Sequence, residues 1–276
     1  LGIALQDQGR YSEASRMSRR LLAVGTSLGD RMLVAHARLG LGYAALQTGD
    51  LIEARAAYDL ALAGYQAGRD DRGTLFALTG LGRTLTGLGE DERAEETFSE
   101  VVRRAHDAGD ANLEGDALNN LGVGRFGRGD AEGALDDFTR AFELQRARGA
   151  VRSMVTAGAN VALLHTHLGQ YDEADTLLAA MLAECTSHGF VDLQAAVLNQ
   201  LGHVRLTRGR DRDAAAVLRR SLGLRDAVPA APQIVALAGL ARTLMHLDSA
   251  ATALALIETH RARLLRVTPA PRRYAN

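Results

Sequence analysis

Apolar residues recur along this chain at the spacing of an α-helix, and short polar breaks divide them into stretches. One such stripe runs from Arg31 to Thr48, and a second runs from Leu51 to Ala67 after the break at Gly49-Asp50. No strand-like alternation of apolar and polar residues occurs, and no proline precedes Pro229. The pattern therefore predicts an all-α protein built as a row of antiparallel helix pairs.

The breaks return with a fixed period of 40 residues. A glycine ends one helical stretch, and an alanine follows five residues later in the next stretch. The glycines are Gly9, Gly49, Gly89, Gly129, Gly169 and Gly209, and the alanines are Ala14, Ala54, Ala94, Ala134, Ala174 and Ala214. A period between about 20 and 50 residues is typical of a repeat array. We therefore predict a solenoid in which each helix pair packs against its neighbours.

A second set of breaks closes each pair. These breaks are Gly29-Asp30, Gly68-Arg69-Asp70, Gly109-Asp110, Gly149 and Gly189. The carboxylates of Asp30, Asp70 and Asp110 stand where they can accept hydrogen bonds from the free N–H groups of the next helix. We expect each of these three residues to cap a helix.

Leu-Gly recurs inside the first helix of most pairs. It occurs at Leu1-Gly2, Leu41-Gly42, Leu81-Gly82, Leu121-Gly122 and Leu201-Gly202, with Val161-Ala162 as the variant. A glycine inside a helix costs about 1 kcal/mol relative to alanine, so its return in phase indicates that a neighbouring helix passes too close for a side chain. The large partners expected from the second helices are Tyr58, Phe98, Phe138, Leu178 and Leu218.

These residues carry a family resemblance. Leu121-Gly122, Gly129-Asp130, Ala134, Phe138 and Ala141 stand at the offsets of the tetratricopeptide repeat (TPR), and the longer period resembles the long-helix TPR variety. That variety occurs in LGN/Pins-type scaffolds and in the C-terminal arrays of bacterial STAND/SARP-type transcription regulators. The resemblance implies a right-handed TPR superhelix of about seven helix pairs, the first truncated, in one domain over residues 1–267.

The last helix pair departs from the pattern, and we interpret residues 230–266 as a C-terminal cap. Its phase slips by one residue, so that Asp248-Ser249 replaces Gly-Asp, and Pro232 suits the first turn of a helix. His260 and Arg261 replace apolar residues of earlier pairs, which predicts a polar outer face. We expect residues 268–276 to form a flexible tail.

Composition excludes several classes of protein. The net charge is −1, so nucleic acid is not an expected direct partner. All 32 basic residues are arginine, and the single Cys185 cannot form an internal disulfide, which favours a reducing, cytoplasmic setting. No signal peptide or membrane-spanning apolar run is evident. Because the sequence opens on Leu1 within a repeat, we interpret it as part of a longer protein.

Apparent catalytic and cofactor motifs have simpler explanations. The G-x-G-x-x-G match from Gly122 to Gly127 follows no strand, and its first glycine belongs to the repeat. His165 and His167 point in different directions on a helix, which disfavours a metal site, and Cys185 is expected to be a buried structural thiol. The paired acids Glu95-Glu96 and Asp136-Asp137 suggest a solvated helix surface. We therefore expect no enzymatic activity and no cofactor.

The resemblance also implies a binding face. In TPR arrays, repeat positions 2, 5, 6, 9, 12 and 13 of the first helix tend to point into the concave groove. Carried onto this chain, the partner-binding residues are His36, Tyr43, Gln47, Phe76, Thr79, Arg83, Asp116, Asn119, Asn120, Phe126, Asn160, His167, Asn199, Gln200 and His203.

Asparagine is concentrated on this expected face. The chain has six asparagines, and four of them, Asn119, Asn120, Asn160 and Asn199, lie at repeat positions 5 or 6. Asparagine is otherwise a poor residue inside a helix. A primary amide both donates and accepts hydrogen bonds, so a ladder of amides can hold the backbone of an extended peptide. Alternatively, the same amides brace neighbouring helices. Of the Lys/Arg/Asn clamp with which chaperone-binding TPRs hold a C-terminal carboxylate, only Arg83 and Asn120 are in place, so we do not expect recognition of that kind.

The sequence therefore predicts a non-catalytic domain that binds a protein or extended peptide in its concave groove. We expect it to be the sensor or regulatory C-terminal part of a larger bacterial transcription or signalling regulator, in contact with an N-terminal domain of the same chain. Alternatively, it is a receptor for a small molecule or signal peptide, with Tyr43, Phe76 and Phe126 inside the superhelix.

Overall fold

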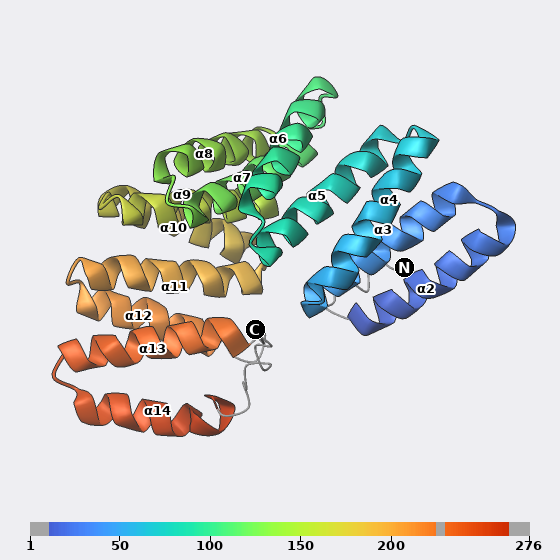
Figure 1. Ribbon diagram of the computed structural model, residues 1–276. Coiled ribbons are helices and arrows are strands. Elements are labelled where there is room, and N and C mark those ends of the chain that lie inside the picture. Colours follow the sequence, from blue (N-terminus) through green and yellow to red (C-terminus); the bar gives the residue numbers. More distant parts are fainter. Residues whose placement is uncertain (1–10, 225–229, 265–276) are drawn as a thin grey trace. The chain divides into compact units, whose positions relative to one another are not determined.

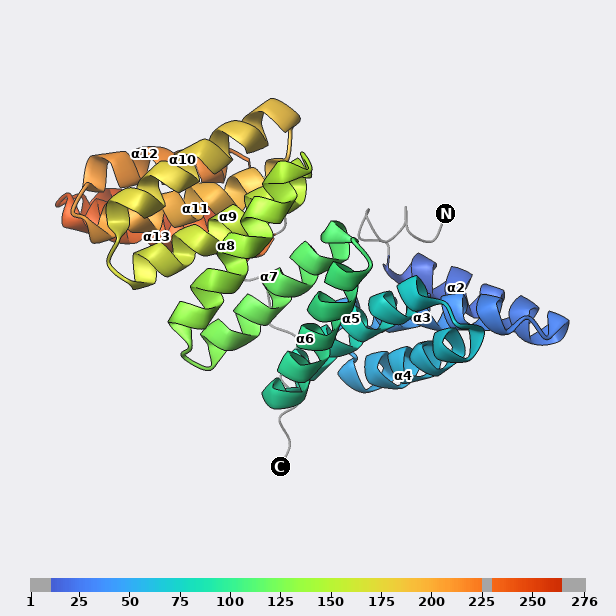
Figure 2. The ribbon, with the colours of Figure 1, turned by 90° about the horizontal axis from the view of Figure 1, so that it is seen from above.

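The computed structural model describes residues 11–224 and 230–264, and it consists of two compact units, residues 1–145 and 146–276. The part of the chain that is described forms thirteen α-helices and contains no β-strand (Figures 1 and 2). Consecutive helices pack against one another within each unit, as the hydrophobic pattern predicts. The fold is thus an α-solenoid of TPR-like helix pairs. The expected first turn at Gly9 and the tail at 268–276 lie outside the described residues.

In unit 1, odd-numbered helices are the first helices of pairs and even-numbered helices are the second. The helices are α2 (Tyr11–Leu28), α3 (Arg31–Thr48), α4 (Leu51–Gly68), α5 (Asp71–Leu88), α6 (Asp91–Asp107) and α7 (Ala111–Gly127). Helix α8 (Ala131–Ala147) reaches across the boundary between the units.

Unit 2 continues the same alternation. Its helices are α9 (Val151–His167), α10 (Tyr171–His188), α11 (Val191–Thr207), α12 (Asp211–Gly223), α13 (Ala230–His246) and α14 (Ala250–Leu264). Helix α11 contacts both α9 and α13, so the first helices of successive pairs also touch one another.

The glycines inside the first helices are places of close approach, as predicted. A Cβ atom added to Gly122 would lie 2.8 Å from the Phe138 ring, and one added to Gly82 would lie 2.7 Å from the Phe98 ring. Gly42 faces Tyr58 and Gly202 faces Leu218 in the same way. The large side chains of the second helices therefore fill the space that the glycines leave, and they are almost completely buried.

The turns between helices depend on a left-handed residue. Nine glycines adopt positive φ there: Gly29, Gly49, Gly89, Gly109, Gly129, Gly149, Gly169, Gly189 and Gly209. At the break Gly68-Arg69-Asp70, α4 extends through Gly68 and Arg69 takes the left-handed conformation with φ 55°. Asp248 does the same with φ 53° in the last pair, where the sequence has no glycine.

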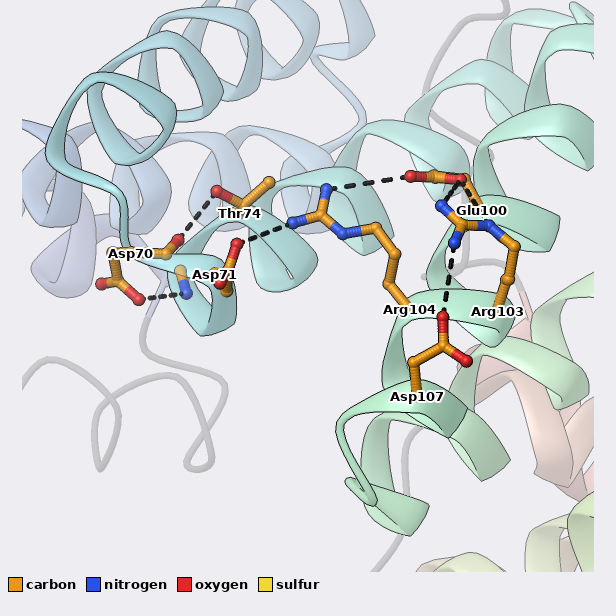
Figure 3. A network of polar contacts seen from close by, with 8 residues as sticks. Asp70, Asp71, Thr74, Glu100, Arg103, Arg104 and Asp107 are labelled. Carbon is orange, nitrogen blue, oxygen red and sulfur yellow. Dashed lines mark hydrogen bonds and ion pairs between the residues drawn. The ribbon is translucent and has the colours of Figure 1, made fainter.

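Aspartates cap the helices that follow these turns. The carboxylate of Asp30 accepts a hydrogen bond from the Leu33 backbone N–H at 3.0 Å, and Asp70 accepts one from Gly73 at 2.8 Å. Asp110 caps α7 through Leu113. All three predicted caps are confirmed. Figure 3 shows the Asp70 cap beside the ion pair between Arg104 of α6 and the neighbouring Asp71.

The last pair is less polar on its outer side than predicted. Pro232 lies in the first turn of α13, as expected. On α14, however, Leu254 is 61% exposed and Ile257 is 40% exposed, while His260 is half-buried with its Nδ1 2.9 Å from the Leu256 carbonyl oxygen. The replacement of apolar residues at two positions thus does not make the whole outer face polar. The Arg261 side chain lies outside the described residues.

The packing rule predicts opposite effects for two glycines of α7. Gly122→Ala should lower the free energy of unfolding by about 1–3 kcal/mol, because the Phe138 ring is buried and has no room to move. Gly124→Ala should raise it by up to about 1 kcal/mol, since nothing lies within 4 Å of an added Cβ and alanine favours the helix. Urea unfolding followed by circular dichroism measures both. Equal effects of the two substitutions would contradict the packing rule.

Arg69→Gly should stabilise the chain by up to about 1 kcal/mol, because glycine adopts the left-handed conformation without the strain of a Cβ atom. The matched control is Gly89→Ala, which introduces that strain at φ 75° and should destabilise. The same unfolding measurement applies. Destabilisation by Arg69→Gly would show that the arginine side chain matters more than the backbone geometry.

Candidate functional site

The first helices of unit 1 present one side away from the second helices, and we call this side the inner face of unit 1. Helix α5 contacts both α3 and α7. Residues 40 apart therefore form rows across the face, and one such row consists of Tyr43, Arg83 and Val123. Val123 is 47% exposed and Phe76 is 42% exposed, so this face carries open apolar side chains beside polar ones.

The inner face of unit 2 is built in the same way from α9, α11 and α13. Leu163 and His203 stand in the same register as Val123, and Leu163 is 36% exposed. Val235 on α13 is 57% exposed. Each unit thus combines exposed apolar side chains with polar ones on the same set of helices.

All fifteen predicted binding residues lie on first helices, but their exposure differs. His36, Phe76, Arg83, Asp116, His167 and His203 are exposed; Tyr43, Gln47, Thr79, Asn119, Asn120, Phe126, Asn160 and Gln200 are half-buried; Asn199 is buried. Several side chains are held in place by neighbours. The His36 ring packs edge-on against Tyr65 at 5.2 Å, and the Arg72 guanidinium lies 5.5 Å from the centre of the Phe76 ring.

The asparagines do not behave as one uniform ladder. Asn199 donates a hydrogen bond of 2.9 Å to the Pro232 carbonyl oxygen and so braces α11 against α13. Asn120 donates to the Asp116 carbonyl oxygen of its own helix at 2.8 Å. The buried Asn199 Oδ1 and Gln200 Oε1 accept no hydrogen bond from the protein. The bracing alternative therefore applies to Asn199, while the role of the others remains a prediction.

Arg83 stands out among the charged residues of the inner face. It is exposed on α5 between Tyr43 and Val123 in its row, and no carboxylate of the described residues pairs with it. Asp116, an acid predicted for the same face, accepts a hydrogen bond of 3.4 Å from the Gln145 Nε2. The inner face of unit 1 thus offers a cation to a ligand beside apolar side chains.

The prediction from sequence omitted the apolar members of this face. Val123 and Leu163 occupy the repeat position of Tyr43, Arg83 and His203. On α13, Val235 occupies the repeat position of Phe76. The 40-residue period already places these apolar residues at the repeat positions of predicted binding residues.

Charged side chains also brace consecutive pairs. In unit 1, Arg125 of α7 hydrogen-bonds to Glu95 at 3.2 Å and to Asp137 at 3.0 Å. In unit 2, Arg205 holds Asp175 in the same register at 2.8 Å. The interpretation of Asp137 as a solvated surface acid is wrong, because its side chain is 2% exposed.

These contacts shift pKa values in opposite directions. Burial raises the pKa of Asp137 to about 6, although the Arg125 and Arg140 charges oppose the shift. Burial also acts to raise the pKa of Glu95, but hydrogen bonds from Arg125 and Arg128 outweigh it and hold that pKa below its ordinary value. The hydrogen bond from Arg205 lowers the pKa of Asp175.

A surface hollow of about 540 Å³ lies at the N-terminal end of unit 1, lined by residues of α2, α3 and the start of α4. Tyr11, Arg16, Leu41 and Glu53 are among its lining residues. It contains none of Tyr43, Phe76 and Phe126, the aromatics expected around a small molecule.

Other reactive groups have structural surroundings. Cys185 is completely buried, as predicted, and burial raises the pKa of its thiol to about 11. The Nδ1 of His165 lies 2.6 Å from the Gln170 Oε1. In residues 11–224 and 230–264, no three His, Cys, Asp or Glu side chains gather as a metal site would require. None of the helices in those ranges has the length and apolarity needed to cross a bilayer.

The sequence matches the tetratricopeptide repeat family over residues 1–67 and 33–105. The helix pairs beyond residue 105 continue the same register of glycines, alanines and large side chains. The chain is therefore a TPR array. No curated protein sequence matches it.

Solved structures share the fold at low sequence identity. BtubC (BKLC) from P. vanneervenii has a TM-score of 0.69 and 18% identity, covering 82% of this chain and 96% of that chain. A Rap protein complexed with Competence and Sporulation Factor has a TM-score of 0.67 and 15% identity, covering 96% and 74%. NprR in complex with its cognate peptide NprX has a TM-score of 0.64 and 17% identity, covering 95% and 76%. At these identities the likeness shows the fold alone.

The pKa shifts predict a pH dependence of stability. Because the pKa of folded Asp137 lies above the ordinary 3.8, its proton favours the folded state, and this contribution is lost as the pH rises through about 6. Asp137→Asn remains neutral at every pH. The free energy of unfolding of the wild type relative to this variant should therefore fall by about 2 kcal/mol between about pH 4 and pH 7.

Glu95→Gln is the matched control. The lowered pKa of Glu95 means that its contribution is present above its unfolded pKa and is lost as the pH falls, so this variant should show the opposite slope. Urea unfolding over the pH range measures both. Slopes of the same sign for the two variants would contradict the assignment.

Proposed function

We propose that this TPR array is a non-catalytic domain that binds an extended peptide segment of a partner along its inner faces. The observation that carries the proposal is the exposure of Phe76 and Val123 on the same face as the polar residues predicted to bind. Large apolar side chains left open beside hydrogen-bonding groups are typical of a surface that a partner covers. Leu163 and Val235 give unit 2 the same character.

The chemistry of unit 1 favours a particular kind of peptide. Arg83 has no carboxylate partner among the described residues, so an acidic group of a ligand would form a charge-assisted hydrogen bond with it. Tyr43 and Val123 on either side in the row favour apolar side chains. We therefore expect the ligand to combine apolar residues with an Asp, a Glu or a C-terminal carboxylate.

The comparisons support peptide binding by analogy. The Rap and NprR structures are described as complexes with Competence and Sporulation Factor and with the peptide NprX, and another NprR structure is described as a quorum sensor. The proposal for the present chain still depends on its own exposed residues, because similarity of fold does not establish similarity of function.

We further propose that the array is the sensor part of a larger bacterial regulator and lies in the cytoplasm next to an N-terminal domain. Ligand binding would then favour one arrangement of the helix pairs over another and so bias that neighbouring domain. The coding sequence upstream of Leu1 tests this directly. A nucleotide-binding loop followed or preceded by a helix-turn-helix is the expected result; a start without any such domain would overturn the regulator proposal.

Peptides selected from a random display library against the whole chain provide the binding test. Phe76→Asp and Val123→Asp should each weaken binding of a selected peptide about tenfold or more, because a charge replaces a covered apolar side chain. Arg83→Met should lower the affinity for peptides that contain a carboxylate. It should also make that affinity less dependent on the salt concentration. Fluorescence anisotropy with labelled peptides measures the affinities.

Ser99→Asp, at an exposed position of the second helix α6, is the control and should leave binding unchanged. Asn120→Ala combined with Asn160→Ala separates the two roles of asparagine: loss of affinity with unchanged helicity supports the ladder. Peptides that bind equally to Phe76→Asp, Val123→Asp and wild type would overturn the proposed site.

A further inference from the structure

The second helix α4 carries an apolar stripe on the side opposite its core. Its buried side consists of Ala54, Ala57, Tyr58, Ala61 and Tyr65. Its opposite side consists of Ile52, Ala56, Leu60, Ala63 and Ala67, all exposed, and we call these five residues the α4 stripe. Ile52 is 71% exposed and Leu60 is 49% exposed. Their spacing of three and four residues places them along one line of the helix.

The fold itself does not require this stripe. Residues 40 positions later on α6 occupy the same places, and they are Glu92, Glu96, Glu100, Arg103 and Asp107. The corresponding positions of α8 begin with Glu132, Asp136, Arg140 and Glu143. A second helix of this solenoid is thus stable with a fully charged outer side, which indicates that the apolar side of α4 serves another purpose.

The helices on the two sides of α4 carry opposite charges at this register. Ion pairs place α4 between them, since Arg19 of α2 reaches Glu53 and Arg55 reaches Glu90 at the start of α6. The outer side of α2 presents Arg16 and Arg20, both exposed. No residue that the structure describes forms an ion pair with either arginine, or with Glu92 and Glu96 of α6.

We propose that two copies of this chain pair through the α4 stripe, related by a two-fold axis that runs parallel to α4. Such an axis places α2 of each copy opposite α6 of the other. It also leaves corresponding residues of the two copies at the same level along the helix axis. Because the repeat period keeps the register, Arg16 then faces the partner's Glu96, and Arg20 faces the partner's Glu100. A two-fold axis perpendicular to α4 would instead set α2 against α2, so that like charges would repel.

The size of the side chains fits this arrangement. Alanines at Ala56, Ala63 and Ala67 allow the two α4 helices to approach within about 8–10 Å, while Leu60 and Ile52 supply the apolar contact. A stable interface buries about 1,200–2,000 Å² in total, so the stripe needs the neighbouring helices as well. The oppositely charged residues of α2 and α6 supply the polar rim of the interface. This surface lies on second helices, so the inference does not rest on peptide binding by the first helices.

Sedimentation equilibrium of the whole chain tests the stripe. The wild type should form a dimer, and Leu60→Glu combined with Ile52→Glu should raise the dimer dissociation constant at least tenfold without loss of helicity. Leu254→Glu, at an equally exposed leucine of α14, is the matched control and should leave the dimer intact. A wild type that is monomeric at all concentrations tested, or a dimer that Leu254→Glu weakens as much as the stripe variant does, would overturn the proposal.

Charge reversal tests the direction of the axis. Arg16→Glu with Arg20→Glu should weaken self-association, and so should Glu96→Arg with Glu100→Arg. Mixing the two variants should restore a dimer with one copy of each, because both α2–α6 contacts are then between opposite charges. Restoration also shows that both variants are folded. Failure of the mixture to associate, while the wild type dimerises, would overturn the parallel arrangement.

Discussion

The close approach between the two helices of a pair is the constraint on which the rest of this structure depends. A glycine inside the first helix lets the ring of Phe98 or Phe138, or the side chain of Leu218, pack directly onto its backbone. That contact fixes the rotation of both helices about their axes. The orientation of the remaining sides of each helix is thereby fixed, because one side must face the next pair and one must face outward.

This division leaves two surfaces that the core does not use. The first helices turn polar and apolar side chains, such as Arg83 and Val123, to the inner face. The second helices turn their outer sides to solvent; these sides are charged on α6 and α8 and apolar in the α4 stripe. Charged braces such as Arg125 with Glu95 connect consecutive pairs without occupying either surface. Binding and self-association are therefore assigned to opposite sides of the array.

Most of the fold could be predicted from the sequence, because the repeat displays each packing rule several times. The glycine at 122 and the ring at 138 were paired correctly from spacing alone, as were the aspartate caps. At the break Gly68-Arg69-Asp70 the sequence does not show which residue is left-handed, and the backbone geometry shows that it is Arg69. Asp137 was taken for a surface acid because it stands beside Asp136, although its repeat position holds Ala57, Leu177 and Val217 in other pairs.

The candidate site was predictable in outline only. The register identifies the helices expected to bind, but exposure depends on the size of the neighbouring side chains. Thus Asn199 proved to brace α13, while Val123 and Leu163, which the prediction did not include, proved to be exposed. A single sequence does not separate these cases.

Hydrogen–deuterium exchange of the whole chain, with and without a selected peptide, shows which helices a ligand covers. We expect added protection in first helices, in α3, α5 and α7 or in α9, α11 and α13, with the second helices unchanged. Protection confined to second helices such as α4 and α6 would contradict this expectation.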